Sequence, residues 1–387
     1  MPGIIMRMER IWEAVVIGAG PAGALAARTL ARENRRVLLL EKGTVGQREK
    51  ACGGMLPLAV FDRYALDETS IQTRLEVEDF RFPWGQRVTR QPVATVHRCE
   101  FDACLARQAQ AAGAELRDGA AVRRMERLPD GDLRLSGAGR GESFELETRL
   151  VIFADGANTL ARPALGIGID RARDPAALGL EYNFSAPSNG DTTYWMLFDH
   201  PLLANTWGYA WVFPNRDDYN AGVFFPAGAK RELTQPGGPD PVRLHLRNML
   251  DGKLKDLAQL KRIGARIPMR PARRLAADRA LVAGDAAGLV FPLTAGGIGP
   301  ALWSGDLCGQ AAAQALRENR LEAAALRGYE SAVKISPLYR EMQKQALLYQ
   351  AAQGFGRFDR HLFAKIFQIY KLKNELSALE AFRYALW

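Results

Sequence analysis

Short apolar runs and helix-prone segments alternate at the start of the chain. Residues 14–17 and 37–40 contain only alanine, valine, isoleucine and leucine, a pattern typical of parallel strands that are buried on both faces. Residues 24–32 lie between these runs and favour a helix. A strand, a helix and a second strand in this order predict a βαβ unit, in which both strands belong to one parallel sheet.

Glycines follow the first of these strands in the spacing G-x-G-x-x-G. Gly18 suits the tight turn, Gly20 lets the backbone approach a pyrophosphate, and Gly23 lets the helix pack on the strand. The helix N-terminus would then present unpaired N–H groups to the phosphates. Glu41 ends the second strand, where a carboxylate accepts hydrogen bonds from ribose hydroxyls. We therefore predict a dinucleotide site. Its other predicted members are Pro21, Ala22 and Lys42.

Between residues 166 and 265 the pattern changes to short stretches rich in β-branched and aromatic residues. The stretches LGLEYNFSA, TTYWMLFDH, WGYAWVFPN and YNAGVFFPA are separated by turn sequences such as PSNGD and NRDD. They predict an antiparallel sheet, inserted as a substrate domain into the first domain. Alternation places about half of its aromatic side chains in the core. The other half would line a long apolar tunnel.

The last segment, residues 329–387, has a helical pattern that Pro337, Gly354 and Gly356 divide. Within it, residues 357–373 make an amphipathic basic segment. Such a helix either covers a core or lies on a membrane surface.

The composition, with 48% hydrophobic and 25% charged residues, is that of a globular protein, and the length of 387 residues predicts two interlocked domains. The net charge of +9 fits either a soluble basic surface or attraction to anionic partners such as pyrophosphates and membrane head groups. We expect no nucleic-acid partner, because the chain shows no zinc spacing and no RNA-binding motif.

The four cysteines and four histidines are too scattered to predict a metal site. Free thiols without a disulfide framework suit a reducing cytoplasm. Residues 1–11 are charged and hold no apolar run long enough for a signal peptide, so we expect a leader outside the fold. No stretch reaches the ~18 apolar residues of a spanning helix. We therefore expect a cytoplasmic protein, at the inner face of the membrane if the C-terminal segment binds lipid.

Three later segments contain further candidate residues. The first is a predicted helix that begins at Arg98 and stops at Gly113, and the second is an apolar strand that ends at Asp155. The third is a strand followed by a loop and a long helix. Its candidate residues are Gly284, Asp285, Pro292, Gly296, Gly297 and Ile298.

Together with the glycine-rich turn, these segments resemble those of FAD-dependent enzymes of the aromatic-hydroxylase type. The resemblance implies an α/β fold with a Rossmann-like domain that binds FAD noncovalently. In that group the arginine touches the phosphates or the flavin face, the D-G pair supports the site, and the aspartate of the G-D pair holds the ribityl chain. These roles would fall to Arg98, Asp155 and Asp285. The glycines after P-x-T would lie against the flavin ring, with the next helix directing its N-terminus at the flavin O2.

The predicted FAD-binding domain comprises residues 12–165 and 266–328, on either side of the substrate domain. Only one dinucleotide fingerprint is present. NAD(P)H would therefore bind transiently as the reductant, or a ferredoxin would deliver the electrons.

A closer resemblance is to the geranylgeranyl reductase family, which saturates isoprenoid double bonds. The loop EKACGGMLP, residues 49–57, is similar to the family's K-x-C-G-G-x-x-P loop, and TWGYAWVFP is similar to its P-x-x-Y-x-W-x-F-P pattern. Thr206 replaces the first proline of that pattern. The resemblance implies that Cys52 and Gly53 face the flavin. It also implies an apolar or amphiphilic substrate bound by Tyr209, Trp211 and Phe213.

Two interpretations of Cys52 follow. Its thiol donates a proton to the alkene or positions it, or Cys52 is a small residue that packs between glycines. The first predicted function is an alkene reductase, in which reduced flavin supplies hydride. The alternatives are a monooxygenase or halogenase, in which reduced flavin first reacts with O2, and an electron carrier without catalysis. The halogenase stretch G-W-x-W-x-I-P is matched less closely, because Tyr209 and Phe213 replace its first tryptophan and its isoleucine.

Overall fold

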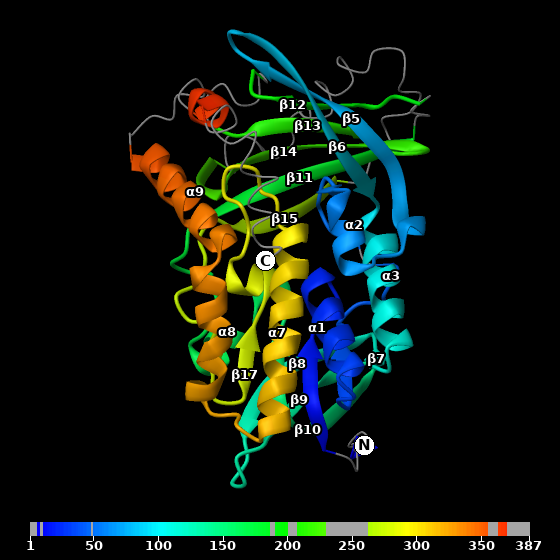
Figure 1. Ribbon diagram of the computed structural model, residues 1–387, viewed down its shortest axis with the longest axis vertical. Coiled ribbons are helices and arrows are strands. Elements are labelled where there is room, and N and C mark those ends of the chain that lie inside the picture. Colours follow the sequence, from blue (N-terminus) through cyan, green and yellow to red (C-terminus); the bar gives the residue numbers. More distant parts are fainter. Residues whose placement is uncertain are drawn as a thin grey trace.

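Two β-sheets, one above the other in Figure 1, organise the computed structural model of the chain. The structure describes residues 6–7, 11–47, 49–185, 190–199, 207–229, 262–354 and 363–369. This arrangement confirms the predicted α/β class, with a Rossmann-like sheet, a second sheet rich in antiparallel pairs, and helices near the C-terminus.

The first sheet has nine strands among the described residues, and its main path runs β16-β17-β10-β2-β3-β7. The strands on this path are β2 (Trp12–Ile17), β3 (Val37–Leu40), β7 (Glu115–Arg117), β10 (Glu142–Phe153), β16 (Ala276–Ala277) and β17 (Ala280–Val282). Flanking them are β1 (Met6–Arg7), β8 (Ala120–Arg127) and β9 (Leu133–Gly139).

Strands β2, β10 and β17 are parallel neighbours, and Phe153 lies opposite both Ile17 and Val282. Their carboxyl ends therefore meet at one edge of the sheet. The segments that follow them begin at Gly18, Ala154 and Ala283. Ligands of open parallel sheets bind outside this edge, and three of the predicted site segments lie there.

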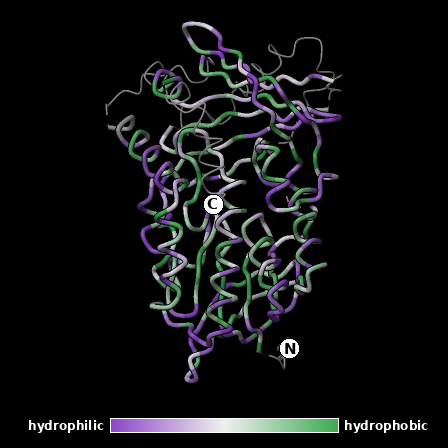
Figure 2. The backbone as a smooth tube through the Cα atoms, in the orientation of Figure 1, coloured by the Kyte–Doolittle hydropathy of each residue, from purple (hydrophilic) through white to green (hydrophobic). Residues whose placement is uncertain are grey.

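Helices cover the faces of this sheet (Figure 1). Those that pack on its strands are α1 (Pro21–Arg32), α3 (Arg98–Ala111), α7 (Ile298–Glu318) and α8 (Ala323–Ile335). The other helices are α2 (Ala59–Tyr64), α4 (Ala161–Leu165) and α9 (Pro337–Gly354), and α2 and α9 lie nearer the second sheet (Figure 1). Single 3₁₀ turns are η1 (Glu68–Ser70), η2 (Gly156–Asn158), η4 (Ala227–Ala229) and η5 (Gly284–Ala287). Strands and helices of the interior are largely hydrophobic, whereas hydrophilic segments lie at the lower end of the molecule and along its outer edges (Figure 2).

Glycines set the close packing of α1 against α7. A methyl group built on Gly305 would lie 2.2 Å from the Ala22 carbonyl oxygen, and one on Gly309 would lie 2.8 Å from that of Ala26. Because neither position tolerates a side chain, the two helices approach each other with their backbones nearly in contact. Gly305 lies against Ala22 and Gly309 against Ala26, so the two helices run in the same direction. The N-termini of both helices therefore point to the same end of the sheet (Figure 1).

The second sheet has eight strands in the described part of the chain, in the order β15-β11-β14-β13-β12-β5-β6-β4. They are β4 (Met55–Pro57), β5 (Ile71–Phe82), β6 (Gly85–Val96), β11 (Ala176–Ser185), β12 (Thr193–Leu197), β13 (Tyr209–Pro214), β14 (Asp218–Pro226) and β15 (Arg262–Pro268). All pairs are antiparallel except β5 with β12.

Strands β11 to β14 are the four stretches that the sequence predicts as strands. The sheet also takes β4, β5 and β6 from residues 55–96, ahead of the predicted substrate domain. The boundaries at residues 165 and 265 stay a prediction.

Aromatic residues join the second sheet to the C-terminal helices. The ring of Tyr349 in α9 meets Trp207 at 4.4 Å between centroids, and Phe367, in the helix of residues 363–369, lies 4.5 Å from Phe198. Most of the predicted amphipathic basic segment and most of the predicted leader lie outside the described residues. Within the leader, Met6 and Arg7 form β1, which pairs with β10.

Candidate cofactor and substrate site

The three glycines of the G-x-G-x-x-G turn have different surroundings. Gly18 has a φ of +102°, and a methyl group on it would lie 2.4 Å from the Ala154 carbonyl oxygen. A methyl group on Gly23 would lie 1.8 Å from the carbonyl oxygen of Gly18. A methyl group on Gly20 would meet no atom of the described residues within 4 Å. Gly18 and Gly23 are thus needed by the fold itself, whereas Gly20 borders open space.

Glu41 ties the turn to the end of β3. One of its carboxylate oxygens accepts the N–H of Ala19 at 2.9 Å, the other accepts the N–H of Gly43 at 3.1 Å, and the side chain is buried. These contacts position the turn at the carboxyl edge of the sheet. The predicted contact of Glu41 with ribose stays a prediction.

Asp155 follows β10 at the same edge. Its Oδ2 accepts the N–H of Leu160 at 2.7 Å, whereas its Oδ1 is buried without a hydrogen-bond partner among the described residues. Burial raises the pKa of this carboxyl, although hydrogen bonds from Thr159 and Leu160 act in the opposite direction. An unpartnered acceptor at this edge fits a site that a hydrogen-bonding ligand completes.

Two further predicted members of the dinucleotide site have different surroundings. Ala22 is buried, and its methyl group would lie 2.9 Å from a methyl group built on Gly284. Lys42 is exposed.

A cavity of about 300 Å³ opens between the two sheets. Most of the other predicted site residues line it. These are Pro21, Cys52, Gly53, Arg98, Tyr209, Trp211, Phe213, Asp285, Gly296, Gly297 and Ile298. Pro292 is buried and is absent from the lining. The cavity therefore brings together five segments that are far apart in the chain.

The loop that carries Cys52 packs directly on strand β13. A methyl group on Gly53 would lie 2.6 Å from the ring of Phe213 and 3.3 Å from the indole nitrogen of Trp211. Gly54 has a φ of +67°, and its carbonyl oxygen accepts the N–H of Val96 at 2.9 Å. Only glycines allow the loop to approach the aromatic strand this closely.

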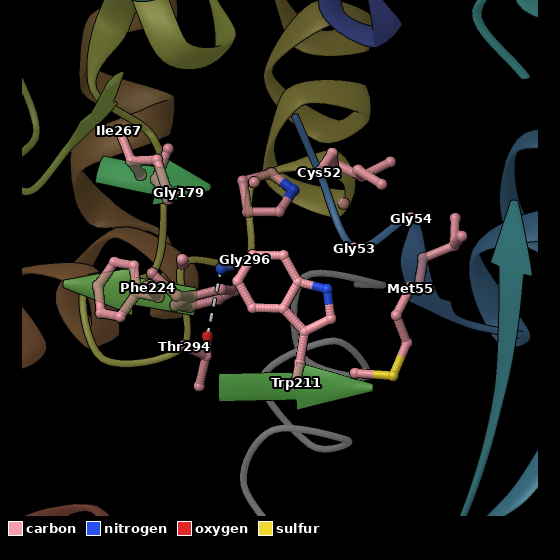
Figure 3. Close-up of a pocket in the computed structure, with 18 of the residues that line it drawn as sticks. Cys52, Gly53, Gly54, Met55, Gly179, Trp211, Phe224, Ile267, Thr294 and Gly296 are labelled. Atoms are coloured by element: carbon pink, nitrogen blue, oxygen red, sulfur yellow. Dashed lines mark hydrogen bonds between the residues drawn. The ribbon is translucent and has the colours of Figure 1, made fainter. Parts of the chain in front are cut away.

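The aromatic strand also contacts the loop that precedes α7. The Tyr209 hydroxyl donates to the Thr294 carbonyl oxygen at 2.6 Å. The indole of Trp211 projects into the cavity between the loop of Cys52 and Gly53 and the loop of Thr294 and Gly296 (Figure 3). The Y-x-W-x-F-P stretch thus connects the two loops that the family resemblance places at the flavin.

Arg98 is a buried cation at the wall of the cavity. Its guanidinium donates to both oxygens of Asp102, at 3.0 and 2.8 Å, and hydrogen-bonds the side chain of Cys52. Burial lowers the pKa of Arg98, but the charge of Asp102 and the contact with Cys52 outweigh it and raise the pKa above its ordinary value. Arg98 therefore stays positively charged beside the thiol.

The N-termini of α1 and α7 supply backbone donors at the same place. Neither Gly20 nor Gly297, the residues that precede these helices, gives a side-chain cap. Pro21 and Ile298, the first residues of the two helices, line the cavity. Uncapped helix N-termini attract anions. Asp285 lies at the α7 N-terminus, where its Oδ1 would be 3.4 Å from a methyl group built on Gly297, and its Oδ2 is 3.5 Å from the ammonium of Lys50.

The residues present fit a dinucleotide with a flavin. The open face of Gly20 and the α1 N-terminus suit a pyrophosphate, and the α7 N-terminus suits the negative charge of a reduced ring. Asp155 and Asp285 supply acceptors for hydroxyl groups. The described residues contain no group of three or more His, Cys, Asp or Glu side chains placed to hold a metal ion.

Comparison with protein families decides the class of this fold. The model of the FAD-binding domain family matches residues 12–323. The chain belongs to this family. It is therefore an FAD-dependent oxidoreductase, and the predicted resemblance to geranylgeranyl reductases is confirmed by its relatives.

Among the relatives is a digeranylgeranylglycerophospholipid reductase of Methanococcus vannielii. It is 25% identical over 332 residues, which are 84% of this chain and 82% of the relative. Among solved structures, a geranylgeranyl bacteriochlorophyll reductase-like protein of Thermoplasma acidophilum is 18% identical with a TM-score of 0.72, and the match covers 88% of this chain and 87% of that one. At this identity the structural likeness shows the fold alone.

A protein described as a probable FAD-dependent monooxygenase, from Pseudomonas aeruginosa, also shares the fold. It is 19% identical with a TM-score of 0.67, over 93% of this chain and 100% of that one. The fold alone therefore does not distinguish a reductase from a monooxygenase. The choice depends on residues in the cavity.

Three polar residues near Cys52 were missed by the sequence analysis. Glu181 and Asn183 lie in β11 and Asn220 lies in β14. Glu181 is 3% exposed, and burial raises its pKa to about 6, against the opposing effect of hydrogen bonds from Cys52, Asn183 and Asn220. A sequence pattern was present: Glu181 and Asn183 interrupt the apolar stretch LGLEYNFSA at alternate positions, and such positions share one face of a strand.

Proposed function

We propose that this FAD-dependent oxidoreductase saturates carbon–carbon double bonds of an isoprenoid or similar apolar chain. The convergence of the Cys52 loop, the Y-x-W-x-F-P strand and the loop before α7 on one cavity carries this proposal. Relatives named as reductases of digeranylgeranyl lipids, over more than four fifths of the chain, support it.

The glycine-rich turn and the α1 N-terminus would hold the pyrophosphate of FAD, and Asp285 would hold its ribityl chain. Gly296, Gly297 and the α7 N-terminus would border the ring. When bound and reduced, FAD supplies a hydride. NAD(P)H or a ferredoxin as the source of its electrons stays a prediction.

Aromatic side chains would hold the substrate. Tyr209, Trp211 and Phe213 line the cavity, together with Tyr194 and Phe224. The Tyr209 hydroxyl donates to the Thr294 carbonyl oxygen, and the Trp211 indole nitrogen donates to Asn220 Oδ1, so these two polar groups are already hydrogen-bonded within the protein. An apolar chain could therefore lie against these rings without breaking either bond.

Cys52 would complete the addition of two hydrogens. A proton on its Sγ would pass to the alkene carbon that does not receive hydride, and water would restore that proton afterwards. Arg98, which hydrogen-bonds the Cys52 side chain, would stabilise the sulfur while it carries negative charge.

Other predicted partners remain open to test. No helix of the described residues is long and apolar enough to cross a bilayer. Binding at the inner face of a membrane would give access to a lipid substrate and stays a prediction.

Anaerobic reoxidation tests the proposal. Protein loaded with FAD and reduced with dithionite should regain the oxidised flavin spectrum when a geranylgeranyl compound is added without O2, and the product should gain two hydrogens by mass spectrometry. The saturated analogue is the control and should leave the flavin reduced. Reoxidation that requires O2 and yields a hydroxylated product would replace the proposal with the monooxygenase alternative.

Substitution of Cys52 tests the proton-donor role. Because a hydroxyl is a poorer acid than a thiol of similar size, Cys52→Ser should slow single-turnover alkene reduction by ~10²–10⁴-fold, or less where water substitutes, while FAD binding is unchanged. Cys52→Ala and Cys52→Leu separate chemistry from packing. If Ser and Ala variants both react at the wild-type rate and only Leu is impaired, Cys52 is a packing residue.

A further inference from the structure

Strand pairing sets polar residues in two rows on one face of the second sheet. Trp211 lies opposite Gly222, which lies opposite Glu181. In the next row Asn220 lies opposite Asn183. Directly opposed residues point to the same face, and Trp211 lines the cavity. All these side chains therefore project toward the cavity side, beneath the loop of Cys52.

Gly222 makes room for this arrangement. A methyl group on Gly222 would lie 2.3 Å from the Trp211 indole. The indole therefore lies across the glycine, and its Nε1 donates to Asn220 Oδ1 at 2.7 Å. This bond leaves the amide nitrogen of Asn220 directed away from Trp211.

The amide nitrogen of Asn220 donates in two directions. It reaches the Cys52 carbonyl oxygen at 3.3 Å and Asn183 Oδ1 at 3.0 Å. Asn183 Nδ2 in turn donates to Glu181 Oε1 at 2.9 Å, and Glu181 Oε2 accepts the N–H of Cys52. The chain of bonds is closed: both backbone polar groups of Cys52 are held by side chains of the sheet.

We propose that Glu181, Asn183 and Asn220 are positioning residues that clamp the Cys52 backbone and so fix its thiol in the cavity. This proposal rests on the proposed function in one respect: that function supplies the substrate that the Cys52 thiol would contact. A loop rich in glycine has many accessible conformations, and hydrogen bonds on both sides of Cys52 select one of them.

The clamp depends on the charge of Glu181. Both carboxylate oxygens accept N–H groups, so a proton on either oxygen would face a donor and break one bond. The charged and titratable groups around it are Arg98 with Asp102, Cys52, and His97, whose Nε2 lies 3.1 Å from Asp218 Oδ2. With a pKa of about 6, Glu181 is ionised at neutral pH and protonated at pH 5. The clamp should therefore hold at neutral pH and open in mild acid.

Alkylation of Cys52 measures the clamp without substrate. Wild-type and Glu181→Gln proteins, both loaded with FAD, are treated with iodoacetamide, and modification of Cys52 is followed by mass spectrometry relative to Cys99 in the same molecule. Loss of a hydrogen bond to a charged group predicts modification about tenfold faster in the variant at pH 7.5. At pH 5 the two rates should converge, because the wild-type carboxyl is already protonated.

Two further variants complete the design. Glu330→Gln is the matched control, because Glu330 accepts the N–H of Leu275 at 2.8 Å away from the cavity, and it should leave Cys52 alkylation unchanged. Asn220→Ala should accelerate alkylation at both pH values, since an amide does not titrate, and it carries the test if Glu181→Gln fails to fold.

Equal rates in wild type and Glu181→Gln at pH 7.5, or a rate ratio that is the same at both pH values, would overturn the proposal. So would an unchanged rate in Asn220→Ala. The alkylation experiment contains no alkene, so its result does not depend on whether the protein is a reductase. If alkylation contradicts the clamp, alkene reduction is still tested separately by anaerobic reoxidation.

Discussion

Gly20 differs from its neighbouring glycines in having open space where its side chain would be. Its φ of −75° and ψ of −177° suit any residue. We therefore predict that Gly20→Ala changes the stability of the FAD-free protein by less than about 1 kcal/mol. The same variant should weaken FAD binding by roughly tenfold or more, about 1.4 kcal/mol, because its methyl group occupies the place of the pyrophosphate. Titration of FAD fluorescence and urea unfolding measure the two effects.

Gly23→Ala is the control for this prediction. Its methyl group would meet the Gly18 carbonyl oxygen, so it should destabilise the FAD-free protein as well. An unchanged FAD affinity in Gly20→Ala would move the pyrophosphate away from this turn.

Glu181 links stability to pH in a direction opposite to that of a carboxylate whose pKa is lowered in the folded protein. Its pKa of about 6 in the folded protein exceeds the ordinary 4.5, so the folded state binds the proton more tightly. Its contribution to stability is fully present below pH 4.5 and is lost as pH rises through 6. The difference between the ordinary pKa of 4.5 and the folded-state pKa of about 6 corresponds to about 2 kcal/mol of unfolding free energy. About 1 kcal/mol of this is lost between pH 5 and pH 8.

The difference in unfolding free energy between wild type and Glu181→Gln, measured in urea without FAD, should therefore shift by about 1 kcal/mol against the wild type from pH 5 to pH 8. Comparison with the variant cancels the titration of groups that do not interact with Glu181. A difference that is constant over this range would show that the carboxyl titrates as it does in the unfolded chain.

Among the elements, the pair α1 and α7 depends most directly on small residues. Gly305→Leu would place a side chain where even a methyl group lies 2.2 Å from the Ala22 carbonyl oxygen. Overpacking of this kind typically costs ~1–3 kcal/mol. Because the N-termini of both helices border the cofactor site, FAD affinity should fall as well. Urea unfolding and FAD titration of the same protein measure both losses.

Gly328→Ala is the helix control. Gly328 is an exposed position inside α8, and a methyl group there would meet nothing within 4 Å. This variant should stabilise the protein by ~0.5–1 kcal/mol through helix propensity. A Gly305→Leu protein as stable as the wild type would mean that the two helices can separate without cost.

The sequence predicted those elements whose hydrophobic periodicity is visible within the element itself. The apolar runs of β2 and β3, the glycine-rich turn and the alternating strands β11 to β14 were all predicted. The hairpin of β5 and β6 was not, because its polar residues belong to a half-exposed ribbon that has no continuous apolar run. The clamp around Cys52 was not predicted either, since it depends on the register between β11 and β14 and on Gly222, and register is a tertiary property.

At the scale of the whole molecule, the cavity lies where the two sheets meet. FAD bound there would contact residues that both sheets position. We predict that FAD at 100 times its dissociation constant raises the unfolding free energy by about 2.7 kcal/mol, and that both sheets unfold in one transition. Variants that retain only Trp12, which packs in the first core, or only Trp207, which packs in the second, report the two sheets separately. Two distinct midpoints would show that the sheets are independent.

The order of strands in the two sheets also determines when each strand can pair during synthesis of the chain. In the first sheet, β10 lies between β2 and β17, and in the second, β11 lies between β14 and β15. The growing chain therefore cannot cover β11, or the last residues of β10 at Val151–Phe153, on both edges until residues 262–282 have been synthesised. Long-range pairing of this kind is slow, and unpaired strand edges attract other chains. The nascent protein should thus depend on chaperones until the last third of its synthesis, and fragments that end before residue 262 should aggregate rather than fold.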